Sequence, residues 1–356
     1  MQILRVLFIL LIASGCAQER DVTISRYKIE RIPKLNSIGS GLQYHRVETT
    51  SRFVNHFYSV SDGTNEPAIL EVKTTKDLAQ VVKYIPIKID AKLDLEGIAL
   101  APDGSFWLAN EEGPSLINFD PVHRKIKNIL IAGQQLPILL RSMQAGRGFE
   151  GVGVVGDKIF AAMQSSLNIE GRTAEALFIR ILAYNLRNNT LKMYAYPLDD
   201  FSGKRRSQVQ ITDIAPLDED RLLVVEVAPS GVQKLVLADL REATDINNKM
   251  ANEKELEFVV DRDILFGKPL SKDSGLIRPV NKHTVLDFVD IGWNGGVIEG
   301  VTVLDDNLKL AISNSGADDS ELWIISMPEE LTPRRGFWIY ILIPLGMALI
   351  YLRYKE

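Results

Sequence analysis

One short pattern recurs along the chain and constrains its fold more than any other feature. In each copy a polar or acidic residue opens an alternating apolar run, a turn follows, and a second apolar run ends in a polar residue. The five copies begin at Ser40, Glu96, Glu150, Asp213 and Glu299, and glycine follows in all but the fourth. Two short apolar runs around such a turn predict a β-hairpin.

Further strand-like runs follow each predicted hairpin. After the copy at Glu96 come "SLINFDP" (115–121) and "KIKNILIAG" (125–133), which complete four strands. Few stretches show the period of an amphipathic helix, which argues against a two-domain α/β fold. Four-stranded units repeated along a chain predict an all-β fold, a β-propeller.

The number of blades follows from the length of the repeating part. At about 40–50 residues per unit, the domain expected over residues 24–330 accommodates about six blades. The longest gap, between Asp213 and Glu299, is expected to contain the blade that shows no copy of the pattern, with strand-like runs at 254–266 and 283–293. The run at 22–35 is expected to supply the strand that closes the ring onto the last blade.

Composition and charge narrow the class of protein. The 356 residues are 46% hydrophobic and 24% charged, with a net charge of −5. This composition suits a globular protein and gives no indication of nucleic-acid binding. The one cysteine, Cys16, excludes an intramolecular disulfide.

The N-terminal residues predict export. Residues 1–15 combine an early positive charge at Arg5 with an apolar stretch at 6–13, as in a signal peptide. The sequence "ASGC" resembles a bacterial lipobox and predicts that Cys16 is lipidated. The alternative is an ordinary signal peptide that contains a cysteine. Either interpretation places the remainder of the chain outside the cytoplasm.

The C-terminal residues predict a second membrane element. Residues 336–352 carry no charge and are flanked by basic residues on both sides. They predict a transmembrane helix followed by a short cytoplasmic tail, residues 353–356; a sorting signal that is later removed is the alternative. Together the two ends predict a bacterial cell-envelope protein, membrane-anchored with its propeller on the periplasmic or extracellular side.

Four sequence blocks carry a resemblance to a known family. They are "DLEGIALAPDGSFWLANEEG" (94–113), "GRGFEGVGV" (146–154), "ITDIAPLDEDRLLVVE" (211–226) and "VIEGVTVLDDNLKLAISN" (297–314). In order and spacing they resemble the phytase-like propeller family, also called the "esterase-like activity of phytase" family, over about residues 38–327. The resemblance implies a secreted or membrane-attached, calcium-binding propeller that hydrolyses phosphoesters.

The acidic residues of the pattern predict a metal site. The innermost strand of a blade starts at the mouth of the central channel, and the second strand returns there, so the polar residues that mark these positions are expected to converge. Oxygen ligands without Cys or clustered His favour Ca²⁺, or Mg²⁺, over zinc. The predicted ligands are Glu96, Glu150, Asp213, Glu299, Asn110, Glu111, Glu226 and Asn314.

A cation at the mouth suggests a hydrolytic mechanism. It would neutralise a phosphate and polarise a water molecule, and the predicted catalytic residues are Glu96, Glu150 and Arg147. The planar guanidinium of Arg147 matches the geometry of phosphate oxygens. The alternative is structural: the carboxylates accept backbone hydrogen bonds between blades, and Arg147 forms a salt bridge at the rim.

Two other functions stay open. One is a non-catalytic propeller that binds a protein or ligand; the other is a lactonase-like hydrolase. The sequence contains no Gly-x-Ser-x-Gly elbow, no His-Glu-x-x-His motif, no Walker loop and no dinucleotide fingerprint. A covalent Ser-His-Asp esterase is therefore not expected, and the predicted partner is a small phosphoester or other anion.

Overall fold

The fold is described by a computed structural model of the whole chain. The described residues are 22–30, 40–46, 55–61, 66–76, 78–89, 92–169, 171, 173, 176–198, 208–228, 231–247, 277–305, 309–314 and 320–327. They form twenty β-strands and one short 3₁₀ helix, η1 (Ile138–Ser142). The all-β prediction is confirmed.

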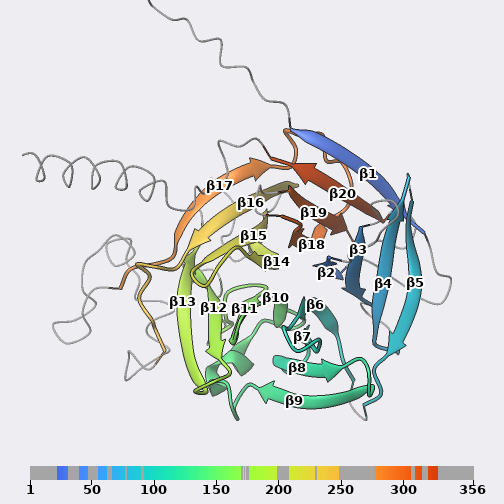
Figure 1. The fold of residues 1–356 in the computed structure, drawn as a ribbon. Helices are drawn as coiled ribbons and strands as arrows, with labels where there is room; N and C mark the ends of the chain where they lie inside the picture. Colours follow the sequence, from blue (N-terminus) through green and yellow to red (C-terminus); the bar gives the residue numbers. More distant parts are fainter. Residues whose placement is uncertain are drawn as a thin grey trace, which may run out of the picture.

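The strands form four-stranded antiparallel blades arranged around a centre (Figure 1). Blade 1 contains β2 (Ser40–His45), β3 (His56–Val60), β4 (Ala68–Thr75) and β5 (Leu78–Pro86). Blade 2 contains β6 (Leu95–Leu100), β7 (Phe106–Asn110), β8 (Ser115–Asp120) and β9 (Lys125–Ile131). Blade 3 contains β10 (Phe149–Val155), β11 (Lys158–Met163), β12 (Phe178–Asn185) and β13 (Thr190–Pro197).

Two more blades complete the ring. Blade 4 contains β14 (Gln210–Pro216), β15 (Arg221–Ala228), β16 (Val232–Asp239) and β17 (Asn281–Asp287). Blade 5 contains β18 (Ile298–Val303), β19 (Lys309–Asn314), β20 (Glu321–Ser326) and β1 (Thr23–Ile29). The innermost strands contact one another in the order β2, β6, β10, β14, β18 and back to β2, so the ring closes.

The expectation of about six blades is wrong, because the described strands make five. The sequence predicts that the run at 283–293 belongs to an additional blade. This run contains most of β17, which pairs with β16 as the outer strand of blade 4. The run at 254–266 lies outside the described residues. The contact between β14 and β18 leaves no room for a further inner strand between blades 4 and 5.

The predicted closing strand is confirmed. Strand β1 pairs antiparallel with β20, from Thr23 opposite Ser326 to Lys28 opposite Glu321. Its last residues also pair in parallel with the start of β5 in blade 1, at Lys28–Leu78 and Ile29–Ala79. Strand β1 therefore joins blade 5 to blade 1, because it pairs with β20 along one edge and with β5 along the other.

The core lies between neighbouring blades rather than in one central layer. The first two strands of blade 2 are buried on both faces: all but the last residue of β6 and every residue of β7 are buried. Aromatic residues pack across blade boundaries: Tyr58 of blade 1 meets Phe106 of blade 2 with ring centroids 4.7 Å apart. Burial on both faces explains why these strands are nearly continuous apolar runs.

A buried histidine in blade 1 predicts a pH-dependent stability. The Nδ1 atom of His56 lies 3.6 Å from Glu71 Oε1, and Lys73 is its cross-strand neighbour. Burial, then the charge of Lys73, lowers the pKa of His56 below its ordinary 6.5. The stabilisation from this neutral histidine is complete above pH 6.5 and is lost as the pH falls through the lower pKa of the folded state.

We therefore expect the free energy of unfolding to fall more steeply between about pH 7 and about pH 5 in the wild type than in His56→Gln. Urea unfolding at several pH values measures this difference. Parallel pH profiles for the two proteins would contradict the assignment.

Several sequence predictions concern residues outside the described part of the chain. These are the signal peptide (1–15), the lipidated Cys16, the transmembrane helix (336–352) and the tail (353–356). Among the described residues, no helix has the length and apolar character required to cross a bilayer.

Candidate metal centre at the channel mouth

A β-bulge marks the start of every innermost strand. The register of pairing with the second strand shifts between Leu95 and Gly97 in blade 2. The other four blades show the same kind of shift, which lies between Ser40 and Gln43, between Phe149 and Val152, between Ile211 and Asp213, and between Ile298 and Gly300. A bulge places two residues opposite one and redirects a side chain. Glu96, Glu150 and Glu299 thus leave the regular alternation at the point where the blade faces the channel, whereas Ser40 and Asp213 are paired residues beside the shift.

The glycines of the pattern allow neighbouring inner strands to approach. A Cβ atom on Gly97 would lie 2.2 Å from the carbonyl oxygen of Glu150 in the next blade. A Cβ on Gly41 would lie 2.8 Å from the carbonyl oxygen of Glu96, and one on Gly151 would lie 2.5 Å from the amide nitrogen of Ile214. No other residue fits at this spacing, so the glycine of the pattern is what allows neighbouring inner strands to lie this close.

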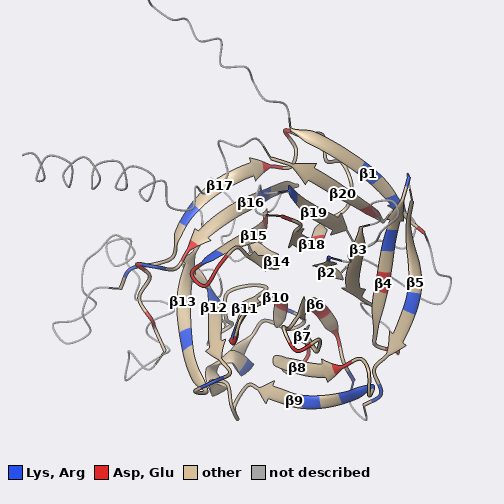
Figure 2. Cartoon of the chain, in the orientation of Figure 1, with Lys and Arg blue, Asp and Glu red and all other residues tan. Residues whose placement is uncertain are grey.

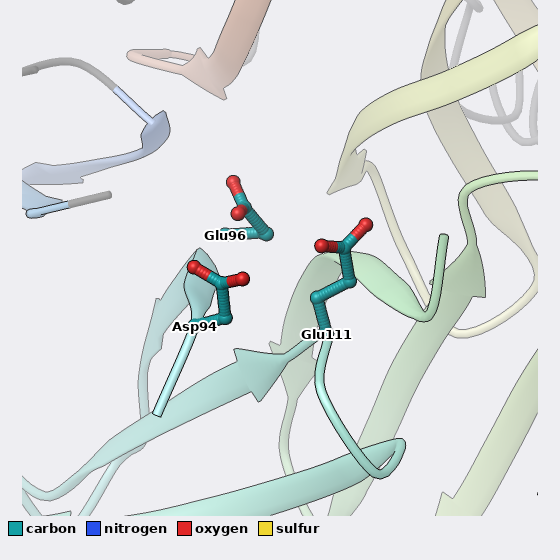
Figure 3. A group of neighbouring side chains, drawn as sticks. All are labelled: Asp94, Glu96 and Glu111. Atoms are coloured by element: carbon teal, nitrogen blue, oxygen red, sulfur yellow. The ribbon is translucent and has the colours of Figure 1, made fainter. Parts of the chain in front are cut away.

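Three carboxylates of blade 2 meet at this end of the channel. Asp94 precedes β6, Glu96 lies within it, and Glu111 directly follows β7. One carboxylate oxygen from each lies within 4.8 Å of the other two (Figure 3). Glu96 and Glu111 are 9% and 8% exposed. Among the described residues this is the one group of three acidic, His or Cys side chains that meets this criterion.

Asn110 fixes the backbone on which two of these carboxylates stand. Its Oδ1 accepts a hydrogen bond of 2.8 Å from the backbone N–H of Asp94. Its Nδ2 donates to the carbonyl oxygen of Glu112 and to Ser115 Oγ. The N–H of Glu111 donates to the carbonyl oxygen of Asp94 at 2.8 Å. Asn110 thus ties both ends of the β6–β7 hairpin together beneath the cluster.

Neighbouring blades complete the surroundings of the cluster. The hydroxyl of Ser40, in blade 1, donates a hydrogen bond of 2.8 Å to Glu96 Oε2. On the other side, a Cβ on Gly148 would lie 2.1 Å from the carbonyl oxygen of Glu111, so the segment before β10 passes directly over it. The half-buried Arg147 is the preceding residue in that segment. The structure therefore places Arg147 in the segment that borders the cluster.

The charges around the cluster are arranged unevenly. Figure 2 shows Lys and Arg on outer strands such as β5 and β9, whereas Asp and Glu lie near β6 and β7. Lys92 Nζ pairs with Glu112 Oε2 at 2.8 Å, and both side chains are largely exposed at the rim.

Three carboxylates this close repel unless a cation or a proton is shared among them. An oxygen-only donor set fits a hard cation such as Ca²⁺.

Other predicted residues lie in the same ring but make different contacts. Glu150, 4% exposed, accepts a short hydrogen bond from Gln164 Nε2 within blade 3. Glu299 is half-buried at the equivalent position of blade 5. Asn314 Oδ1 accepts a hydrogen bond from the N–H of Glu321 at 2.6 Å, so it supports the β19–β20 hairpin of blade 5.

Asp213 is joined to the backbone of neighbouring blades. Its Oδ1 accepts from the N–H of Ile214 and its Oδ2 from the N–H of Val301 in blade 5, both at 2.8 Å. Complete burial raises the pKa of Asp213 well above its usual range, and the N–H groups that it accepts from, including that of Leu42, act in the opposite direction. The hydrogen bond from Val301 is of the kind expected under the structural alternative, in which a carboxylate accepts backbone hydrogen bonds between blades.

Glu226 forms an ion pair within blade 4 and accepts a hydrogen bond from blade 3. Its Oε2 accepts hydrogen bonds of 2.8 Å from both Tyr196 Oη and Lys282 Nζ. The side chain of Glu226 is 1% exposed and that of Lys282 is 13% exposed. The positive charge beside the Glu226 carboxylate is therefore the ammonium group of Lys282.

A family model decides the relationship of the chain to known proteins. The model described as "Phytase-like: Esterase-like activity of phytase" matches residues 39–315, which include the five inner strands and the three-carboxylate cluster. The chain belongs to the phytase-like family. No curated protein matches it.

Solved structures similar to this phytase-like protein are distant. Glutaminyl cyclase of Myxococcus xanthus is 10% identical, with a TM-score of 0.41 over 85% of this chain and 96% of that one. A luciferin-regenerating enzyme is 10% identical, with a TM-score of 0.44 over 86% and 96%. The catalytic domain of an arabinofuranosidase of Coprinopsis cinerea is 10% identical, with a TM-score of 0.42 over 85% and 97%. The assignment rests on the family model.

Sequence reasoning missed one member of the cluster in this phytase-like protein. Asp94 stands two residues before Glu96 in "LDLEG", and residues i and i+2 of an extended segment share a face. That spacing could have identified Asp94 as a third carboxylate. Lys282, the partner of Glu226, had no comparable signal, because the two residues lie on β15 and β17 and meet only in the folded blade.

Proposed function

We propose that this phytase-like propeller is a metal-dependent hydrolase of phosphoesters that acts at the channel mouth. The observation that supports it most is the meeting of Asp94, Glu96 and Glu111 within 4.8 Å. These residues would hold a Ca²⁺ ion, or alternatively Mg²⁺, since both prefer oxygen ligands. Membership of the phytase-like family gives the reaction class its starting point.

The supporting contacts favour a site over a purely structural cluster. Asn110 holds the backbone of Asp94, Ser40 holds the side chain of Glu96, and both are buried. Outer contacts that orient ligating carboxylates are a regular property of metal sites in proteins. A bound cation would stabilise the negative charge of the phosphoester and lower the pKa of a coordinated water.

The residues of the chain would divide the remaining tasks. Arg147, in the segment over Glu111, would bind phosphate oxygens of the substrate through its planar guanidinium. Glu150, whose backbone lies against Gly97, would accept or return a proton at the mouth, with Gln164 orienting its carboxylate.

Removal of the cation tests this proposal. We expect the full-length protein to release p-nitrophenol from p-nitrophenyl phosphate, to lose this activity in a chelator, and to regain it when Ca²⁺ is added. Elemental analysis before and after chelation verifies that the metal has left. Full activity in the metal-free protein would contradict the proposal, and so would hydrolysis of lactones without hydrolysis of any phosphoester.

A further inference from the structure

Two hydroxyl groups interrupt the acidic pattern of the inner strands. At the position of Glu96, Glu150 and Glu299, blade 1 carries Ser40, and blade 4 carries Thr212, the residue at which the pairing of β14 with β15 shifts. A hydroxyl group can donate a hydrogen bond, whereas an ionised carboxylate only accepts. Thr212 donates to the backbone carbonyl oxygen of Ile298, whereas Ser40 donates to the carboxylate of Glu96.

Ser40 is held rigidly against Glu96. It is 1% exposed, and its Oγ donates to Glu96 Oε2 at 2.8 Å across the boundary between blades 1 and 2. Its own carbonyl oxygen accepts a hydrogen bond of 3.0 Å from Ser59 Oγ on the neighbouring strand. The following residue, Gly41, has φ +59°, which allows the backbone of blade 1 to reach the carbonyl oxygen of Glu96.

We propose that Ser40 is a positioning residue for the cation: it fixes the carboxylate of Glu96 so that Asp94, Glu96 and Glu111 are already arranged when the ion arrives. This inference rests on the proposed function only in requiring that the cluster binds a cation. A carboxylate at position 40 would place a fourth negative charge beside Glu96, which would raise the repulsion within the cluster. The hydroxyl instead holds the side chain and leaves the net charge of the cluster unchanged.

The test compares two buried serines of the same blade. Ser40→Ala removes the hydrogen bond to Glu96, while Ser59→Ala removes an equally buried hydroxyl that donates to the backbone carbonyl oxygen of Ser40. Binding is measured on the full-length protein by Tb³⁺ luminescence and by its displacement with Ca²⁺. We expect Ser40→Ala to weaken binding by about 10–100-fold, the range for contacts that orient ligands, and Ser59→Ala to change it by less than about threefold.

A second variant covers the case in which Ser40→Ala does not fold. Ser40→Cys keeps the shape of the side chain but donates weakly, so its affinity should lie between those of the wild type and Ser40→Ala. Circular dichroism checks the fold of each variant. Equal losses in Ser40→Ala and Ser59→Ala would overturn the inference, because the role would then be general packing of blade 1. Unchanged affinity in Ser40→Ala or Ser40→Cys would overturn it as well.

The same measurements separate this inference from the proposed function. Weakened binding in Ser40→Ala, together with no hydrolysis of phosphoesters by the wild type, would support the positioning role and overturn the hydrolase. No binding of Ca²⁺ or Tb³⁺ by the wild type would overturn both, because the cluster would not be a cation site.

Discussion

Glu96→Gln and Glu111→Gln should each abolish measurable Ca²⁺ binding and lower phosphoester hydrolysis by at least about 100-fold, since each removes a charged ligand from a site with three. The two side chains are buried, so no exposed carboxylate can move in to replace them without rearrangement. Isothermal titration with Ca²⁺ and initial rates with p-nitrophenyl phosphate measure the two effects.

Glu299→Gln is the matched control for this prediction. It makes the same chemical change at the equivalent position of blade 5, where the side chain lies outside the three-carboxylate cluster. We expect its affinity for Ca²⁺ to stay within about threefold of the wild type. A loss as large as that of Glu96→Gln would show that the ion is held by the whole ring of repeated acids. Unchanged binding in all three variants would refute the site.

The comparison of Glu96 with Asp213 shows what the sequence could predict about the site. Both residues lie at the start of an inner strand, but Glu96 is the unpaired residue of its bulge, whereas Asp213 follows the unpaired Thr212 and pairs with Val225, one position later. Their partners come from adjacent blades and differ: Glu96 meets the hydroxyl of Ser40, whereas Asp213 meets the backbone N–H of Val301. The repeat therefore predicts the end of the blade at which a residue lies, but it predicts neither the exact register nor what lies across the boundary between blades.

The number of blades shows a similar limit for the fold. The hairpin order and the closing strand followed from local strand patterns. The predicted number of blades depended instead on dividing the length of the domain by the usual length of one blade. Blade 4 is longer than usual, because β16 ends at Asp239 and β17 begins only at Asn281. Strand pairing, not length, assigns β17 to blade 4.

Asp94 and Asn110 show how far a local pattern could identify the members of the cluster. Asn110 was predicted as a ligand because it ends the second strand in a polar group. Its amide is hydrogen-bonded to the backbone on both sides of the hairpin, and Asp94, which it holds, contributes the carboxylate to the cluster. The polar residue at the strand end therefore indicated where the carboxylates meet, but not every side chain that contributes one.

Gly97→Ala should destabilise the propeller by about 3 kcal/mol or more, which places it among the most damaging small substitutions available in this chain. The new Cβ would lie 2.2 Å from the backbone carbonyl oxygen of Glu150 and 3.1 Å from the Cβ of Ala109. Because the first contact is with backbone, it can be relieved only by moving β6 and β10 apart, which also opens the ring at the candidate site. Urea unfolding, or the soluble yield where the variant does not fold, measures the loss.

Gly156→Ala provides the control for backbone strain without a clash. Gly156 lies in the turn between β10 and β11 with φ +56°, and a Cβ added there would meet no atom of the surrounding chain within 4 Å. Its replacement should cost only about 1–2 kcal/mol, the penalty for placing alanine in the left-handed region. Because Gly97 adjoins Glu96, a folded Gly97→Ala protein should also bind Ca²⁺ more weakly, whereas Gly156→Ala should bind normally. Equal losses of stability in the two variants would contradict the close approach of β6 and β10 on which the geometry of the cluster depends.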